Sequence, residues 1–304
     1  MNYKYTFTIA TACYNSSPYI HRVYKSLKTQ TFKDFEWLVV DDCSTDNTVE
    51  IIKKFQKENA FPIRLIVNEK NMNINANWNT FGREANGKFM CIFDHDDESK
   101  PETLQAFFDV WKKYDRPDIA DIRALCEDQY GNLVGEKYPE DEFISDYFYV
   151  YFTLGMEYER FSCFKTSVFN EFPIDLNEWP GAMEAKHAFT ALKYKTIFIN
   201  KILRIYYLRE ENKNNLSKGG RLTDPESVFR WYTYWVNSFQ YRVKGNWKLR
   251  IRKNFAHTFY GLLSKKSIRE IIGSVKKWSN KSMCIFYYPI ALMVYTYLFL
   301  NKKL

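Results

Sequence analysis

Between residues 6 and 115 the sequence alternates short apolar runs with segments whose apolar residues recur at i, i+3, i+4 and i+7. A short uninterrupted apolar run is typical of a strand buried on both faces, whereas the second spacing places apolar side chains on one face of a helix. The expected strands are Thr6–Ala12, Glu36–Val40, Ile63–Val67 and Phe89–Phe93, and the expected helices begin at Pro18, Thr48, Asn77 and Pro101. This alternation predicts an α/β fold with a mainly parallel, Rossmann-like mixed sheet and helices on both of its faces.

Two of the expected strands end in clusters of acidic residues. Asp41 and Asp42 follow the second strand, and Asp94, Asp96 and Asp97 follow the fourth. Ligands of open α/β sheets bind outside the carboxyl ends of the parallel strands, where both clusters would emerge. Crowded carboxylates repel one another unless a cation lies between them, and hard divalent cations prefer oxygen ligands. The pattern therefore favours a ligand and metal site over a solvated acidic turn.

Four stretches follow one another in the first 100 residues: Ala12–Asn15, Gln30–Phe32, Phe35–Thr48 and Phe93–Asp97. Together they resemble the family 2 glycosyltransferases of GT-A fold, of the bacterial type that builds polysaccharide, capsule or lipopolysaccharide. The resemblance covers roughly the first 210 residues, and the ordered set is more specific than any single stretch. The sequence departs from the family at three positions: Ala12 stands where proline is common, Cys43 where glycine is common, and Trp78 where arginine is common.

The resemblance implies a metal-dependent, inverting transfer of a hexosyl or N-acetylhexosaminyl group from a nucleotide sugar, with UDP as the expected nucleotide, to a glycan or lipid-linked acceptor. A divalent ion, Mn²⁺ or Mg²⁺, would neutralise the leaving diphosphate. Its expected ligands are Asp96, the first choice, and Asp97. Asp94 or Asp97 would otherwise bind the ribose or a metal-bound water, and His95 is expected to point away from its acidic neighbours.

The resemblance also implies a set of residues that hold the nucleotide sugar: Ala12, Tyr14, Asn15, Asp42, Asn77, Asp94 and Arg209. Asp42 would accept a hydrogen bond from the base, while Asp41 would bond to its own loop. Lys213 is an alternative to Arg209 as a partner of the diphosphate. The other interpretation of this segment, also left open, is a solvated linker with no role in binding.

An inverting enzyme needs a general base for the acceptor hydroxyl, and the resemblance places it near the start of a helix well downstream. Glu184 is the only carboxylate between Trp179 and His187, so it is the expected base, with His187 as the reserve. A first-turn acid is also favourable through the helix dipole alone, which leaves a purely structural role open. Two further strands are expected after this helix, at Thr196–Ile199 and Leu203–Leu208.

Charge changes abruptly after residue 215. Residues 216–304 contain 17 Lys and Arg but only three acids, whereas residues 1–215 carry more acids than bases. We expect a nucleotide-sugar-binding catalytic domain at 1–215 and a helical, basic and aromatic region at 216–304. A basic region of this kind suits an anionic membrane surface. Nucleic acid is not an expected partner, because no recognised nucleic-acid module accompanies the basic residues.

Residues 283–300 carry no charge, and their length is at the short end for a membrane span. Pro289 and four tyrosines in this stretch favour a helix that lies on the membrane surface. A true span and a buried packing or dimer helix are the alternatives. The expected location is cytoplasmic, peripheral on the inner face of the cytoplasmic membrane.

The six cysteines are scattered without a CxxC pair, which favours reduced thiols in the cytosol. Thr6–Ala12 is too short for a signal peptide, which agrees with that location. A haloacid-type phosphotransferase would need Thr or Val at Glu98, and a nucleotidyltransferase would need a glycine-rich loop after the first strand. A degenerate relative that binds sugar nucleotides as a scaffold remains the alternative function.

Overall fold

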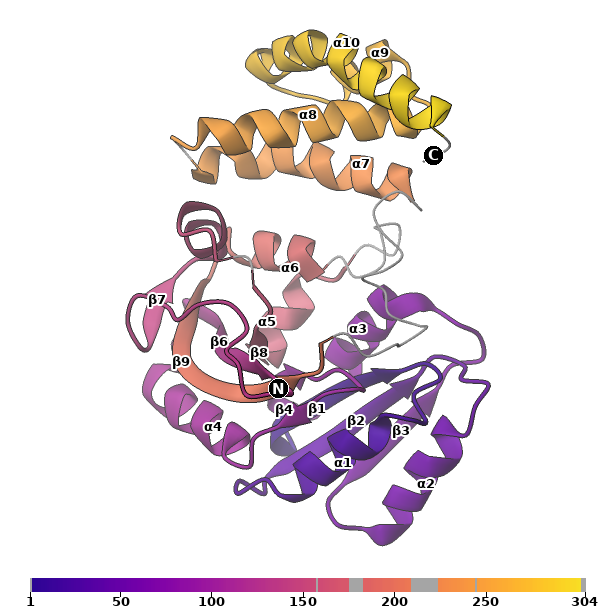
Figure 1. The fold of residues 1–304 in the computed structure, drawn as a ribbon. Helices are drawn as coiled ribbons and strands as arrows, with labels where there is room; N and C mark the ends of the chain where they lie inside the picture. The colour runs from indigo at the N-terminus through magenta and orange to yellow at the C-terminus, as the bar shows by residue number, and fades with distance from the viewer. Residues whose placement is uncertain (1, 157, 175–182, 209–223, 244, 302–304) are drawn as a thin grey trace.

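The computed structural model describes residues 2–156, 158–174, 183–208, 224–243 and 245–301. Within these residues, nine strands form one mixed sheet in the order β3-β2-β1-β4-β8-β6-β9-β5, with β7 paired to β9 (Figure 1). The strands are β1 Tyr5–Cys13, β2 Phe35–Asp41, β3 Ile63–Val67, β4 Gly87–Ile92, β5 Glu98–Ser99, β6 Ile119–Asp128, β7 Phe143–Ser145, β8 Phe161–Lys165 and β9 Lys195–Tyr206. The predicted α/β class and mixed sheet are therefore confirmed.

Strands β1 to β4 are parallel, as the sequence predicts. Strand β8 then pairs antiparallel with both β4 and β6, which is why the sheet is mixed. The four predicted strands of this half begin or end within about two residues of the observed ones. The helix predicted from Asn77 begins four residues earlier, at Asn73.

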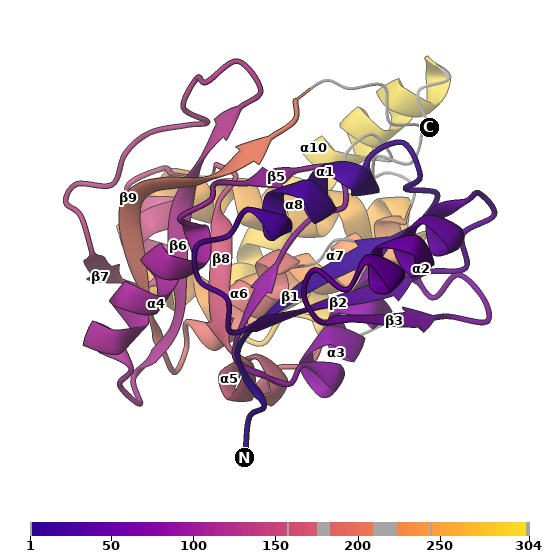
Figure 2. The same cartoon turned by 90° about the horizontal axis from the view of Figure 1, so that it is seen from below.

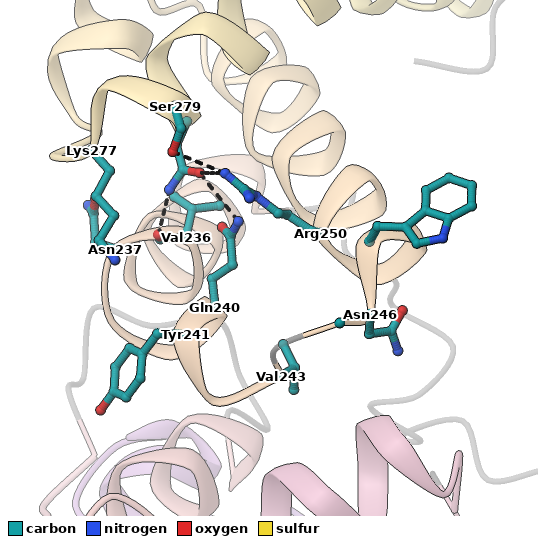
Figure 3. Close-up of a pocket in the computed structure, with 12 residues that line it drawn as sticks. Val236, Asn237, Gln240, Tyr241, Val243, Asn246, Arg250, Lys277 and Ser279 are labelled. Carbon is teal, nitrogen blue, oxygen red and sulfur yellow. Dashed lines mark hydrogen bonds between the residues drawn. The ribbon is translucent and has the colours of Figure 1, made fainter.

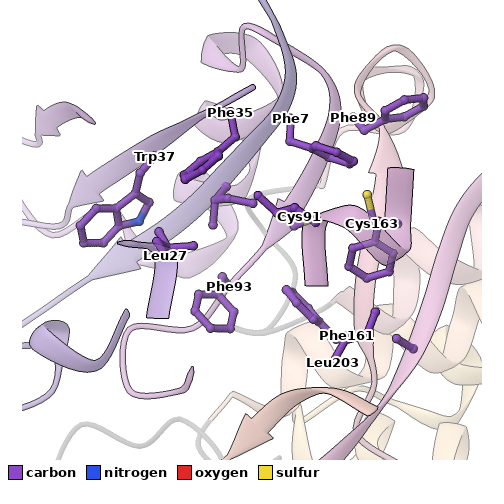
Figure 4. Packing of buried hydrophobic residues seen from close by; sticks show 14 of the residues in the cluster. Phe7, Leu27, Phe35, Trp37, Phe89, Cys91, Phe93, Phe161, Cys163 and Leu203 are labelled. Carbon is purple, nitrogen blue, oxygen red and sulfur yellow. The ribbon is translucent and has the colours of Figure 1, made fainter. Parts of the chain in front are cut away.

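Helices cover both faces of the sheet, as Figure 2 shows for β1 to β3. Helices α1 (Ile20–Lys28), α2 (Thr48–Glu58) and α4 (Thr103–Tyr114) share one apolar cluster with the sheet. Side chains of alternate strand residues, among them Phe7, Trp37 and Phe89, point into this cluster (Figure 4). Helices α3 (Asn73–Glu84) and α5 (Thr166–Glu171) pack on the opposite face. The period of two along each strand therefore divides the core between two layers.

One observed strand differs from the prediction. The two strands expected at Thr196–Ile199 and Leu203–Leu208 form a single strand, β9, whose pairing with β6 shifts between Ile199 and Ile202. An irregularity of this kind bends a strand without ending it. The continuation of β9 pairs with β5, so that Arg204 lies opposite Ser99, directly after the acidic cluster.

The last third of the described chain is helical and forms a separate layer above α6 (Met183–Thr190) in Figure 1. We call residues 224–243 and 245–301 the helical module. It contains α7 (Pro225–Tyr234), a π-helical turn (Trp235–Phe239), a 3₁₀ turn (Gln240–Val243), α8 (Trp247–Leu263), α9 (Ile268–Gly273) and α10 (Trp278–Leu300). The predicted domain boundary at 215/216 lies outside the described residues.

The helical module shares a hydrophobic cluster with the sheet domain. Trp231, Trp235 and Phe239 pack against Tyr147 and Phe152, which lie in and beside a π-helical turn at Tyr149–Thr153. Small residues of α6 complete the cluster. The module is therefore packed on the domain along α6 and the π-helical turn.

Helix α10 is, among the described residues, the one helix long and apolar enough to cross a membrane. Only 11% of its most apolar window is buried against the rest of the chain. Of the third alternative for this stretch, a buried packing or dimer helix, burial within one copy of the chain is therefore not seen, while a dimer helix stays a prediction.

Candidate active site

A small pocket of about 120 Å³ opens at the carboxyl ends of β1 and β2. Residues from four separate parts of the sequence line it, including Ala12, Tyr14, Asp42 and Asn77, all expected to bind the nucleotide sugar. His95 also lines this pocket, although the sequence prediction treats it only as a neighbour of the acids. The fold thus brings these positions together.

Asp42 is buried and holds the loop that forms the pocket wall. One of its carboxylate oxygens accepts hydrogen bonds from Asn68 Nδ2 (2.7 Å) and Met72 N (2.8 Å), and the other accepts from Asn73 N (2.9 Å). Asn77 joins the same network by accepting from Asn68 Nδ2 at 2.9 Å. These contacts fix the start of α3 against the end of β2.

Two other polar residues of this region serve the loops. Asp41 accepts from Ser44 N (2.9 Å) and Ser44 Oγ, so it bonds to its own loop, as predicted. Asn15 adopts a left-handed conformation (φ 50°), and its Oδ1 accepts from Thr45 N at 2.8 Å. Cys43 is also left-handed (φ 65°), a conformation that glycine adopts without strain.

Arg204 of β9 is the centre of an ion-pair cluster beside the acidic motif. Its side chain is 3% exposed. Nη2 donates to Asp94 Oδ2 (2.6 Å), Nε donates to Asp97 Oδ2 (2.6 Å), and Nη1 lies 3.3 Å from Glu159 Oε1. The guanidinium thus connects the motif after β4 to Glu159, which lines a second cavity.

The expectation that Asp97 is a metal ligand needs correction. Its side chain is 1% exposed, and its oxygens accept from Arg204 and from Tyr207 N (3.0 Å). Burial raises the pKa of Asp97, and the adjacent Arg204 opposes that rise. Asp97 is therefore the buried anchor of Arg204, since neither oxygen faces open space.

Asp94 and Asp96 remain the residues that could hold a divalent ion. The Asp94 side chain is 49% exposed, and the backbone carbonyl of Asp96 accepts from Arg22 Nη1 at 3.1 Å. No group of three or more His, Cys, Asp or Glu residues within the described ranges is arranged as a metal site. Mg²⁺ is commonly held by one or two carboxylates together with substrate phosphates. The residues present fit an ion that binds together with a nucleotide diphosphate.

A cavity of about 530 Å³ lies between the sheet domain and the helical module. Glu184, in the first turn of α6, lines this cavity together with Glu159, Tyr147 and Lys253. The Glu184 side chain is 26% exposed, and its Oε1 lies 3.8 Å from Lys253 Nζ. The predicted base thus faces open space that is large enough for part of an acceptor.

His187, the reserve base, is less well placed. Its Nδ1 lies 2.8 Å from Arg123 Nη2, which can only donate, and its ring stacks on Phe164. Burial and the nearby Arg123 lower the pKa of His187 well below its usual value. The neutral ring accepts a hydrogen bond from Arg123 at Nδ1, so this nitrogen does not take a proton from an acceptor.

Other positions lie apart from these cavities or outside the described residues. Arg209 and Lys213 belong to the latter group. Trp78 is packed in the core.

A further cavity of about 350 Å³ lies within the helical module (Figure 3). Its polar groups mostly bond to one another, for example Arg250 Nη2 to Ser279 Oγ at 3.0 Å.

Several charged residues of the site are absent from the sequence prediction, among them Glu159, Arg204 and Lys253. Arg204 stands alone within an apolar strand run, and such a charge signals a buried partner. Glu159 and Lys253 carry no comparable local signal, because their partners are distant in sequence.

The chain is similar in sequence to known proteins. The family described as Glycosyl transferase family 2 matches residues 8–172. An uncharacterized glycosyltransferase of Nostoc sp. is 26% identical over 282 residues, which cover 86% of this chain and 84% of that protein. Poly(ribitol-phosphate) beta-N-acetylglucosaminyltransferase TarS of Staphylococcus aureus is 35% identical over 111 residues, 34% of this chain and 19% of TarS.

Solved structures share the fold. The crystal structure of S. aureus TarS 1–349 in complex with UDP-GlcNAc superposes with a TM-score of 0.58 at 18% identity, covering 96% of this chain and 91% of that one. A mannosyltransferase from Pyrobaculum calidifontis, in complex with GDP-Man and Mn²⁺, gives 0.54 at 15% identity over 95% and 81% of the two chains. The sheet and its helices therefore have the GT-A fold.

Proposed function

Because the chain belongs to glycosyl transferase family 2 and is a glycosyltransferase, we propose that it moves a sugar from a UDP-sugar to a glycan or lipid-linked acceptor in cell-surface polysaccharide synthesis. One observation carries the proposal. Arg204 joins Asp94, beside the nucleotide pocket, to Glu159 in the wall of the cavity that contains Glu184. A donor site and an acceptor site are thus adjacent.

The nucleotide would occupy the pocket at the ends of β1 and β2, which Tyr14, Asp42 and Asn77 line. UDP is the proposed nucleotide because the TarS structure contains UDP-GlcNAc. GDP is the alternative, because the mannosyltransferase structure contains GDP-Man. Asp94 and Asp96 would hold a divalent ion, Mn²⁺ or Mg²⁺. When bound, the ion would supply positive charge for the leaving diphosphate.

Glu184 is the proposed general base. The acceptor hydroxyl attacks the anomeric carbon as the bond to the diphosphate breaks, and Glu184 takes the hydroxyl proton. A single displacement of this kind inverts the anomeric configuration. The cavity around Glu184 holds the acceptor, and its aromatic side chains, among them Tyr151 and Tyr158, provide flat surfaces for a sugar ring.

Replacing the carboxylate tests this role. Glu184→Gln is expected to lower turnover by about 100-fold or more, because an amide does not accept the proton. Calorimetry should show UDP–Mn²⁺ binding within about twofold of the parent, since the nucleotide pocket is unchanged. Glu50→Gln is the matched control, because Glu50 is a first-turn acid of α2 that is exposed to solvent. Near-normal turnover of Glu184→Gln would remove Glu184 from the role.

The helical module is proposed to bind the inner face of the cytoplasmic membrane. Phe286, Met293 and Phe299 of α10 are exposed apolar residues. Lys276, Lys277 and Lys281, around the start of this helix, offer charge to anionic lipid headgroups. A surface-bound module would keep the acceptor cavity close to a lipid-linked substrate.

A further inference from the structure

Lys253 of α8 is a buried cation of the helical module. Its side chain is 7% exposed. Nζ lies 5.2 Å from the ring of Phe152, 5.4 Å from that of Tyr232 and 5.1 Å from that of Trp235. Removing an ammonium group from water costs several kcal/mol, and an apolar side chain of similar volume is often at least as stable in such a place. The charge of Lys253 therefore points to a role besides packing.

The Lys253 ammonium reaches across from the helical module to the sheet domain. One carboxylate neighbour among the described residues is Glu184 of α6, whose Oε1 lies 3.8 Å from Lys253 Nζ. Three rings surround the ammonium, two from the module and one, Phe152, from the sheet domain, so Lys253 has little freedom to move. Cation–π contacts of this kind favour the charged ammonium in a partly desolvated site.

Tyr147 of the sheet domain lines the same cavity as Glu184. Burial and the charge of the nearby Glu184 carboxylate raise the pKa of Tyr147 well above its usual value. The hydroxyl therefore keeps its proton as a donor. Glu184 thus has a protonated tyrosine of the sheet domain and a cation of the helical module as neighbours.

We infer that Lys253 is a positioning residue that aims the Glu184 carboxylate at the acceptor cavity, so that the helical module completes the active site. This inference rests on the proposed role of Glu184 as the base. The module then has a part in catalysis in addition to any membrane binding. A carboxylate without this partner would sample other rotamers, and small misplacements of a catalytic group are costly.

The first test replaces Lys253 by methionine, which has a similar length and suits an aromatic surrounding. The readout is the rate of UDP release from the UDP-sugar that the protein hydrolyses fastest, with Mn²⁺ and with water in place of the acceptor. Lys253→Met is expected to lower kcat by about 10- to 100-fold, with Kd for UDP–Mn²⁺ and the melting temperature close to those of the parent. Lys248→Met, an exposed change on the same helix, is expected to behave as the parent does.

Two results of this test would overturn the inference. A kcat within about twofold of the parent would show that Glu184 does not depend on Lys253. A parallel loss of UDP binding and of the folded structure would assign Lys253 a structural role only.

The second test is a double-mutant cycle with Glu184→Gln. If Lys253 acts through Glu184, adding Lys253→Met to Glu184→Gln changes the residual rate little, because the group that it positions is already gone. A further loss of the same 10- to 100-fold size would contradict the inference. The cycle also separates the two hypotheses, since normal turnover of Glu184→Gln alone refutes the base itself.

Discussion

A single buried guanidinium organises the acidic motif of this enzyme. Arg204 donates to buried Asp97 and to one oxygen of Asp94, whose side chain is still 49% exposed. In the proposed function a divalent ion binds together with the nucleotide sugar. Before it binds, Arg204 would balance part of the negative charge of Asp94 and Asp97. Otherwise, three uncompensated carboxylates would repel one another before the ion arrives.

The first prediction concerns this guanidinium. Arg204→Met leaves Asp97 buried without its cation, and breaking a buried pair in this way costs about 3–5 kcal/mol. Arg116→Met removes an ion pair with Asp118 in which both side chains are about half exposed, and should cost at most about 1 kcal/mol. Urea unfolding of both variants measures the difference, and equal losses would contradict the buried-anchor role of Asp97.

The residues of the site differ in how visible they are in the sequence. Asp42, Asp94 and Asp96 follow apolar runs, so their place at the edge of the sheet follows from the local pattern. The engagement of Asp97 by Arg204 does not, because it depends on the pairing of β5 with β9, more than 100 residues apart. A run of acids shows that a cation is needed, but not which cation supplies the charge.

At the scale of elements, His257 of α8 links the helices of the module. Its Nε2 lies 3.0 Å from Ser274 Oγ after α9, its Nδ1 lies 3.6 Å from Cys284 Sγ of α10, and its ring packs against Phe229 of α7. Burial lowers the pKa of His257 to about 4 from an ordinary value of 6.5. The packed helices therefore require the neutral ring.

A pH dependence of stability follows. The unfolded chain binds a proton at His257 below pH 6.5, whereas the folded chain does so only near pH 4, so stability is lost as the pH falls through this range. At pH 5 the loss should be about 2 kcal/mol relative to pH 7.5. Thermal unfolding of the parent and of His257→Gln at both pH values isolates this contribution. An identical pH dependence in the two proteins would contradict it.

The elements themselves were predictable to different degrees. Each of the first four strands and their helices carries its own apolar period, which is readable without knowledge of its partners. Strands β6 and β8 were not predicted, because their positions depend on tertiary pairing: β8 lies between β4 and β6, and β6 also pairs with β9. The bend in β9 resembles a turn in the sequence, since Asn200 and Lys201 interrupt the apolar run.

At the scale of the whole molecule, the helical module and the sheet domain share both a hydrophobic cluster and the cavity around Glu184. The charge asymmetry along the sequence indicates a second region, but not that this region forms a wall of the cavity around Glu184. Membrane binding and catalysis would then involve opposite sides of one module, with α8 facing Glu184 and α10 largely exposed.

Fractionation of the full-length protein tests the membrane proposal. A surface-bound module should leave the membrane fraction in high salt, because screening weakens its attraction to anionic lipids. Lys276→Gln combined with Lys277→Gln and Lys281→Gln should reduce binding to phosphatidylglycerol vesicles. A protein that is released only by detergent would indicate that α10 spans the bilayer, and one that never sediments with membranes would refute both modes.

The central claim is that this chain transfers sugar from a nucleotide donor at a metal site built on Asp96. The most direct measurement is UDP release from a panel of UDP-sugars, with Mn²⁺ and after chelation, for the parent and for Asp96→Ala. The account predicts that one UDP-sugar releases UDP only when the metal is present, and that Asp96→Ala lowers this rate by about 100-fold or more. Metal-independent release, or an Asp96→Ala variant as active as the parent, would contradict it.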